Sequence, residues 1–267
     1  LPAEVKGHFG ATLRSYVLQQ YYQCQVTQPL LLEALREHGV DISAGQLNAM
    51  LLTGHDQFHQ EKAEVLQAGL AVSSTIQVDD TGARHAGKSG HCTAIGNDLF
   101  AWFASRPHKS RVNFLELLQA GRNDYQLNAE ALSYMRAQKL PKRLLKRHED
   151  RHDQYHFADR AAWGRFLAAE GISNERHVKI ATEGALYGSL MAHGFNASLV
   201  IISDDAGQFN VLLHALCWVH ANRVFQRILP LNDRHAKEIA WVHTQIWEIY
   251  ADLKQYKRQQ TAELKTA

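Results

Sequence analysis

Two pairs of aspartates follow apolar runs in this chain, and acidic side chains in such positions can bind a metal ion. The run IQV ends at Asp79–Asp80, and the run LVII leads through a serine into Asp204–Asp205. When two strand ends lie side by side in a sheet, their carboxylates can share a divalent cation, and hard oxygen ligands favour Mg²⁺ or Mn²⁺ over zinc. A metal held in this way is suited to phosphoryl transfer on nucleic acid. The structural alternative is a turn or a helix cap, a common role for an Asp–Asp pair after a strand.

The composition is that of an ordinary globular protein. With 267 residues, 45% hydrophobic and 21% charged, the chain has enough material for one large domain or two small ones. No run approaches the roughly 18 apolar residues of a membrane span, and the beginning lacks a signal-peptide pattern, so we expect a cytoplasmic protein. Cys24, Cys92 and Cys217 are far apart, which is typical of free thiols. The net charge of +2 neither indicates nor excludes a nucleic-acid partner.

Residues 1–72 are predicted to form a helical module. Within it, one helix is predicted to begin after Thr27. The spacing of Ser43 and Gln46 is that of a capping box at the start of the next helix. Two short helices around a tight connection resemble a helix-turn-helix. However, residues 1–70 hold four Lys and Arg against seven Asp and Glu, and the segment SAGQLNAMLL has no basic residue. Because phosphate contacts need Lys or Arg, a helical packing or dimerisation module is favoured over a DNA reader, and a homo-oligomer is one option that the dimerisation role leaves open.

Near residue 73 the spacing of the apolar residues changes from that of a helix to that of a strand, which predicts a sheet. The predicted strands are 75–78, 91–95, 99–104, 197–203 and 212–218, with hairpin connections at 82–90 and 96–98 and helices at 115–121 and 178–193. This order is that of an α/β ribonuclease H-like mixed sheet, in which the first and fourth strands are neighbours. It places Asp79 beside Asp204. The predicted core covers 73–225, and a further helical segment covers 226–267.

A polar, helix-rich insertion is predicted at about residues 123–173 within this core. Its run KLPKRLLKRHEDR is the strongest basic cluster of the chain. Such a run is often only a solvated face. Beside a core that acts on nucleic acid, it would also contact phosphates, so Lys142, Arg143, Lys146 and Arg147 are predicted DNA-binding residues.

Two zinc-like patterns compete with this interpretation. His148-Glu149-Asp150-Arg151-His152 matches the HExxH pattern, in which two histidines one helical turn apart bind zinc and the glutamate acts as a base. The surrounding run lacks the apolar stripe of a buried zinc-peptidase helix, so a zinc peptidase is a minor alternative. Cys217 and His220 have the spacing of half a zinc site, but no second half follows, which favours packing. No P-loop, dinucleotide fingerprint or serine-hydrolase elbow occurs.

Taken together, these motifs resemble those of a bacterial DDE-type transposase, most closely the insertion-sequence-sixty-six type. VDDTGARHAGKSGH resembles the family's first strand end and its glycine-containing hairpin, and SDDAGQF resembles its second Asp motif. CWVHANRVF is similar to its Cys-Trp-x-His-x-x-Arg-x-Phe segment. The helical front part also resembles the region that precedes the core, so the likeness spans residues 7 to 257.

The resemblance implies that Asp79 and Asp204 are catalytic ligands of Mg²⁺ (or Mn²⁺), with transposon-end and target DNA as partners. It further implies hydrolysis at a transposon end, followed by attack of the freed 3′ hydroxyl on target DNA. Asp80 should not share the role of Asp79, because successive strand side chains point to opposite faces. The third acid, a glutamate, is expected beyond Ala267, so the chain is interpreted as a fragment or truncated copy. The alternative is a catalytically silent DNA-binding or assembly protein derived from a transposase.

Overall fold

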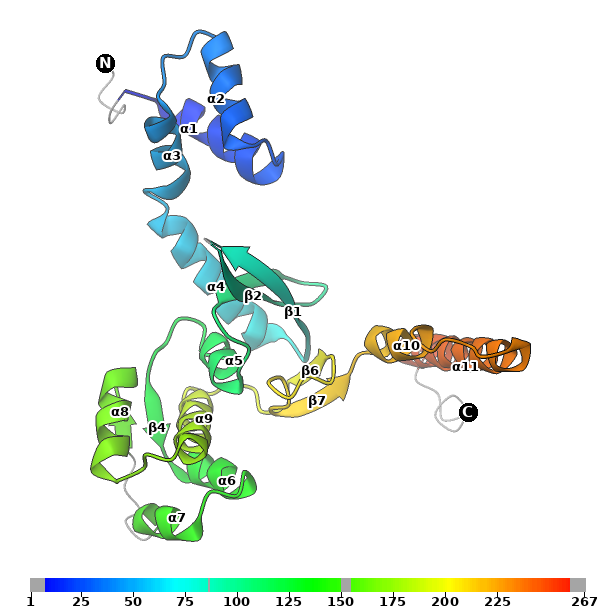
Figure 1. Ribbon diagram of the computed structural model, residues 1–267. Helices are drawn as coiled ribbons and strands as arrows, with labels where there is room; N and C mark the ends of the chain where they lie inside the picture. The colour runs from blue at the N-terminus through cyan, green and yellow to red at the C-terminus, as the bar shows by residue number, and fades with distance from the viewer. Residues whose placement is uncertain (1–7, 86, 150–154, 260–267) are drawn as a thin grey trace. The chain divides into compact units, whose positions relative to one another are not determined.

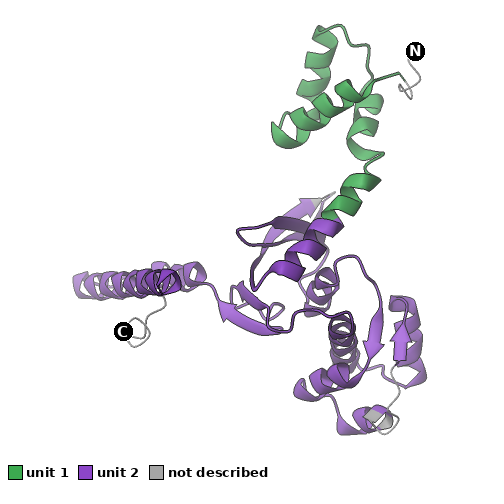
Figure 2. Ribbon diagram, turned by 180° about the vertical axis from the view of Figure 1, so that it is seen from behind, with its two compact units in different colours: residues 1–62 green, residues 63–267 purple. Residues whose placement is uncertain are grey.

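The chain folds as two compact units, each described by itself. The computed structural model describes residues 8–85, 87–149 and 155–259, with the side chains of residues 85, 147 and 149 outside the described set. Unit 1 comprises Leu1–Lys62 and unit 2 comprises Ala63–Ala267 (Figure 2). Unit 1 is helical, and unit 2 contains a five-stranded mixed sheet with helices. The protein is therefore a mixed α/β protein with a helical N-terminal segment.

Unit 1 is a small bundle with its own apolar core. Its elements are α1 (Ala11–Leu18), the π-helix η1 (Gln19–Gln23), α2 (Gln28–Glu37), α3 (Ala44–Leu52) and the beginning of α4 (Asp56–Val72). Val17, Leu31 and Leu47 are at most 1% exposed and form its centre. The predicted capping box is present, since Ser43 Oγ accepts from the Gln46 amide at 3.1 Å and Gln46 Oε1 accepts from the Ser43 amide at 2.9 Å. Local sequence therefore fixes where α3 begins.

The sheet of unit 2 joins strands from two distant parts of the chain. Its strands are β1 (Thr75–His85), β2 (Lys88–Gly96), β3 (Ala101–Arg106), β6 (Val200–Ser203) and β7 (Leu213–Leu216), in the spatial order β3-β2-β1-β6-β7. β1, β2 and β3 are antiparallel to one another in turn, whereas β6 is parallel to β1 and β7 is parallel to β6. The prediction that the first and fourth strands are neighbours is confirmed.

The predicted bounds of the strands were wrong, among them those of the first, second and fifth strands. Residues 82–90 were predicted as a loop, but β1 continues to His85 and β2 begins at Lys88. The turn between β1 and β2 is short and contains Gly87, whose φ of +76° suits glycine. The pairing of the two strands therefore extends almost to the end of the hairpin. At the other end of the sheet, Trp218 was assigned to the fifth strand but instead begins α10 (Trp218–Gln226).

The insertion is more than the polar helical segment that was predicted. Between β3 and β6 lie α5 (Arg111–Leu118), β4 (Tyr125–Leu127), α6 (Ala129–Ala137), α7 (Lys142–Glu149), β5 (Tyr155–Phe157), α8 (Arg160–Ala169) and α9 (Glu175–Ala192). β4 and β5 pair as a separate two-stranded sheet. Tyr125 stacks on Trp163 with a centroid distance of 5.9 Å. Figure 1 shows α6, α8 and β4 grouped around α9, so the insertion has a packed core that is continuous with the main one.

Strand alternation divides the sheet into a covered face and an open face. Ile76, Val78 and Ile201 are at most 3% exposed and belong to the same core as Leu115 of α5 and Leu186 of α9. The intervening residues Gln77 and Asp79 are exposed. The helices thus bury one side of the strands, and their contacts hold the strand ends in place.

The last described elements are α10 and α11 (Asp233–Arg258), which pack against each other. No described residue of α11 is buried. Within the ranges that the structure describes, none of the helices combines the length and the apolar character needed to cross a membrane.

Gly188 provides a test of the packing of α9. A Cβ at this position would lie 2.6 Å from both Asn128 Oδ1 and the Gln126 carbonyl oxygen, and one of these is backbone. We expect Gly188→Ala to lower the free energy of unfolding by about 1–3 kcal/mol, as overpacked cores do. Gly164→Ala on α8 is the control, because its Cβ would meet nothing within 4 Å; it should stabilise by about 0.5–1 kcal/mol. Urea unfolding measures both, and equal effects would contradict the close packing of α9.

Candidate metal site at the strand ends

Asp79 and Asp204 occupy equivalent positions on neighbouring parallel strands. The pairing of β1 with β6 runs from Thr75 opposite Val200 to Gln77 opposite Ile202. Each aspartate follows the last paired residue of its strand by two positions. Because neighbouring strands lie about 4.8 Å apart, the pairing brings both aspartates to the same edge of the sheet.

Each of these carboxylates uses one oxygen in a local hydrogen bond. Asp79 Oδ1 accepts from the Asp80 amide at 2.8 Å, and Asp204 Oδ1 accepts from the Ala206 amide at 3.2 Å. Among the described side chains, neither aspartate has a cationic partner within ion-pair distance. Like charges on adjacent strands repel each other, so a bound cation between them would be favourable.

Asp80 has a different, structural environment. Its two carboxylate oxygens accept hydrogen bonds from Thr93 Oγ1 and, at 3.0 Å, from Gln208 Nε2. Thr93 is buried and lies opposite Asp80 on β2. As alternation predicts, Asp80 therefore faces the side of Val78 and not that of Asp79. Its role is to connect β1 to the loop that follows Asp204.

The loop after Asp204 is also anchored to the helices. Arg111 Nη2 donates to the Gly207 carbonyl at 2.6 Å, and Arg111 Nη1 lies 3.5 Å from Oε2 of the buried Glu183. Phe209 is 1% exposed and packs edge-on against Phe114 with a centroid distance of 5.1 Å. Sequence reasoning missed these contacts, because single charged or aromatic residues far apart in the chain carry no periodic signal. They fix where Asp204 stands relative to β1.

A groove runs along the open face of the sheet beside Asp79. Its volume is about 750 Å³, which lies within the range of ligand pockets. Phe103, Cys217, Trp218 and His220 line it together with Asp79. Cys217 and His220, which have the spacing of half a zinc site, thus both lie in the lining of this groove. The groove offers apolar walls next to one of the candidate metal ligands.

The donor chemistry of the strand ends fits magnesium better than zinc. Within the described parts of the chain, no group of three or more His, Cys, Asp or Glu side chains is placed to hold a metal ion. Mg²⁺ commonly takes one or two protein carboxylates and completes its shell with water and substrate phosphates. Structural zinc sites need four protein ligands, many of them Cys or His. Asp79 and Asp204 are hard oxygen donors of the kind that Mg²⁺ and Mn²⁺ prefer, and two of them are fewer ligands than a structural zinc site uses.

The predicted DNA-binding residues lie on α7 in the insertion. Lys142, Arg143 and Lys146 are exposed, whereas Leu145 is buried on the opposite side of the helix. Arg147 belongs to α7, but its side chain lies outside the described set. α7 packs on α6. The basic face is thus open to a phosphate partner. None of its described contacts reaches the strand-end site.

The zinc-peptidase pattern falls partly outside the described residues. His148 is 8% exposed, with its ring 5.5 Å from that of Phe166 and its Nε2 3.7 Å from the Glu170 carboxylate. The Glu149 side chain and residues 150–152 are not in the described set. The contacts of His148 are those of a core histidine.

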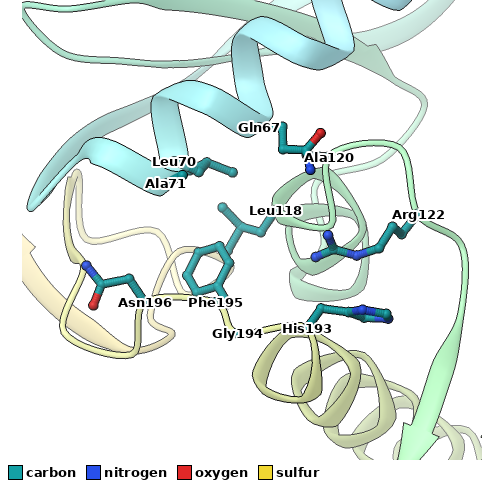
Figure 3. Close-up of a pocket in the computed structure, with 10 residues that line it drawn as sticks. All are labelled: Gln67, Leu70, Ala71, Leu118, Ala120, Arg122, His193, Gly194, Phe195 and Asn196. Carbon is teal, nitrogen blue, oxygen red and sulfur yellow. The ribbon is translucent and has the colours of Figure 1, made fainter.

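A second cavity, of about 200 Å³, lies at the opposite edge of the sheet (Figure 3). Leu70, Leu118 and Phe195 form its apolar wall, and Arg122 and His193 lie together at its polar end. α4 leads into the beginning of β1, and the segment after α9 leads into the beginning of β6. The cavity is therefore next to the strand beginnings and separate from Asp79 and Asp204.

Asp124 lies beside this cavity and is held in its ionised form. Burial would raise the pKa of Asp124, but hydrogen bonds from Gln126, His193 and Ser189 outweigh burial and lower the pKa below its ordinary value of 3.8. His193 Nε2 lies 3.0 Å from Asp124 Oδ2. The ionised carboxylate thus stabilises the packing of β4 against α9.

Comparisons with known proteins give one informative relative. The chain is 39% identical over 196 residues to the uncharacterized protein y4jO of Sinorhizobium fredii, and the match covers 73% of this chain and 61% of the relative. The chain thus spans less than two thirds of that protein's length. No family model matches the chain, and no solved structure matches it.

The two aspartates of the first pair should differ in their effect on stability. Asp80→Ala should lower the free energy of unfolding by about 1–3 kcal/mol, because it removes the acceptor of the buried Thr93 hydroxyl. Asp79→Ala, at an exposed position, should change it by less than about 0.5 kcal/mol. Urea unfolding of both variants measures the difference. A larger loss for Asp79→Ala would mean that Asp79 is the structural residue of the pair.

The stabilisation from Asp124 should depend on pH. Since the folded pKa is lowered, the contribution is fully present above 3.8 and is lost as the pH falls through the folded value. The stability difference between wild type and Asp124→Asn should therefore shrink between about pH 6 and pH 3. Urea unfolding at both pH values checks this, and a difference independent of pH would contradict it.

Proposed function

We propose that this chain is the core of a transposase-like protein of the DDE type, resembling the insertion-sequence-sixty-six type, that cleaves and transfers DNA strands. The observation that carries the proposal is the register of β1 and β6, which puts two carboxylates without cationic partners at one edge of the sheet. Such a pair suits Mg²⁺ or Mn²⁺. Asp79 and Asp204 are the proposed ligands and catalytic residues.

The sheet order supports a ribonuclease H-like core. The first three strands are antiparallel, and the last two are added parallel to the first, in the order β3-β2-β1-β6-β7. Helices α5 and α9 belong to the core on one face, and α10 follows the last strand directly. This is the arrangement expected from the motifs in the sequence. In this proposal, the segment from β4 to α8, which lies between α5 and α9, is an addition to that core.

Each part of the site has a role in the proposed reaction. When bound, the metal ion activates a water nucleophile and stabilises the leaving oxygen of the phosphodiester. Asp80, Gln208 and Arg111 position the loop that carries Asp204, through the contacts to Thr93, Asp80 and Gly207. The exposed residues Lys142, Arg143 and Lys146 of α7 supply phosphate contacts, and Arg147 of the same helix is proposed as a further one. A third carboxylate from beyond Ala267 would complete the ligand set.

A catalytically silent DNA-binding or assembly protein is the second candidate. One observation favours it, namely that among the described residues no group of three or more His, Cys, Asp or Glu side chains is placed to hold a metal ion. Two carboxylates can hold a metal ion and still be too few to support strand cleavage. The two candidates share the partner, DNA, and differ in the chemistry performed on it.

Nicking of a supercoiled plasmid in the presence of Mg²⁺ or Mn²⁺ distinguishes these candidates. Asp79→Ala and Asp204→Ala should each lower the nicking rate by more than about 100-fold, because even changes outside the ligand shell cost roughly 10- to 100-fold. Asp205→Ala is the matched control, since it removes an exposed neighbouring carboxylate that has no proposed role. Equal nicking by wild type and Asp79→Ala would eliminate the enzymatic proposal. DNA binding without nicking by the wild type would favour the silent protein.

A further inference from the structure

We propose that the β1–β2 hairpin and the adjoining end of β3 form a surface that binds the phosphate backbone of DNA. This hairpin surface consists of Arg84, Lys88, His91, Arg106 and Lys109. The choice of DNA as the partner rests on the function proposed above. The surface is distinct from the basic face of α7 and lies on the strand that carries Asp79.

The hairpin extends past the other strands of the sheet. β6 pairs with β1 only at residues 75–77, and β3 pairs with β2 only at residues 91–96. Residues 83–85 and 88–90 are therefore paired only with each other, as a two-stranded ribbon (Figure 1). Arg84 and Lys88 are exposed, and because Arg84 pairs with Ser89 whereas Lys88 pairs with position 85, they lie on opposite faces of this ribbon. A ribbon of this kind is one of the elements that the major groove of DNA admits.

The strand register gathers further cationic side chains at the base of the ribbon. Gly82 lies opposite His91, and His91 lies opposite Arg106 on β3. These three positions share one face of the sheet, and the glycine leaves room above its neighbours because no atom lies within 4 Å of the place of its Cβ. Lys109 is exposed in the loop that follows β3. The cations therefore come from three separate segments and meet only in the fold.

The positive charge of the hairpin surface is not neutralised by the protein. Between Thr81 and Leu115 the sole acidic residue is Asp98, which lies in the β2–β3 turn at the other end of β2. No ion pair among the described residues involves Arg84, Lys88, Arg106 or Lys109. The exposed side chains of Arg84, Lys88 and Lys109 are therefore available to an external anion.

The position of this charge relative to Asp79 indicates a polyanion. Lys88 pairs with position 85, which lies six residues along β1 from Asp79 and on the same face, a distance of about 20 Å at the usual rise. Phosphates along one DNA strand advance about 3.4 Å per nucleotide, so a strand with one phosphate at Asp79 would place another near Lys88 about six nucleotides away. One such DNA strand can bind both kinds of group. Its phosphates pair with the cations directly and with the carboxylates through a bound metal ion.

The salt dependence of binding to a short fluorescent duplex of arbitrary sequence tests this proposal. The measurements use the full chain in EDTA, so they do not depend on strand cleavage. Each lost phosphate contact lowers the slope of log K against log salt by about 0.9, so Arg84→Ala with Lys88→Ala should lower it by about 1.8. The charge-preserving pair Arg84→Lys with Lys88→Arg should retain most of the wild-type slope.

Two further pairs serve as controls. Lys237→Ala with Lys257→Ala removes the same charge from exposed positions of α11 and should leave the slope unchanged. Lys142→Ala with Lys146→Ala tests the face of α7 separately. The proposal is overturned if the hairpin pair behaves like the α11 pair. It is also overturned if the hairpin pair abolishes binding to phosphatidylserine vesicles and leaves the DNA slope unchanged.

The outcomes separate this inference from the proposed function. An altered slope for the hairpin pair, with equal plasmid nicking by wild type and Asp79→Ala, would retain the DNA surface and remove the strand-cleaving role of Asp79. An unaltered slope, with nicking that requires Asp79, would retain the enzyme and remove the hairpin as its DNA contact.

Discussion

The parallel pairing of β1 with β6 is the constraint on which the rest of the structure depends. Only residues 75–77 and 200–202 take part, yet the pairing joins two halves of unit 2 that are separated in sequence by the whole insertion. Parallel strands cannot be joined by a tight turn and need a long crossover. The insertion, with its own aromatic core, is part of that crossover and packs on α9. The register at this short interface decides where both candidate ligands lie.

Because the apolar side chains of one face of the sheet supply the packing, the strands can end in charged residues. Ile76, Val78 and Ile201 supply apolar contacts to the helices, and the strands then end in aspartates that do not have to enter the core. Burying an unpaired carboxylate is costly, so the acids stand beyond the packed region. Asp80 is satisfied by Thr93 and Gln208, whereas Asp79 has only a local backbone bond. Adjacent acids of the same type therefore have opposite roles, one in structure and one available to a ligand.

Charges of opposite sign are kept apart along β1. The carboxylates stand where β6 ends, and the cations of the hairpin stand where only β2 remains as a neighbour. A salt bridge between them would neutralise both groups. Because the strand is rigid and extended, the separation is maintained. Among the described residues, the acidic strand ends and the basic ribbon therefore have no ion pairs with each other or with other side chains.

The sequence by itself determined the local elements and their order. The capping box at Ser43 and the succession of strands follow from spacing and alternation, which depend on near neighbours in the chain, whereas the adjacency of the first and fourth strands was expected from the likeness of the element order to a ribonuclease H-like sheet. Asp79 and Asp204 could be chosen as candidate metal ligands from local sequence too, because each follows a predicted strand. The tertiary structure alone decided the length of the hairpin, the small sheet of β4 and β5, and the anchoring of the Asp204 loop by Arg111 and Gln208. Three-residue strands are too short to show a period, and contacts between isolated polar residues arise only when the fold brings distant segments together.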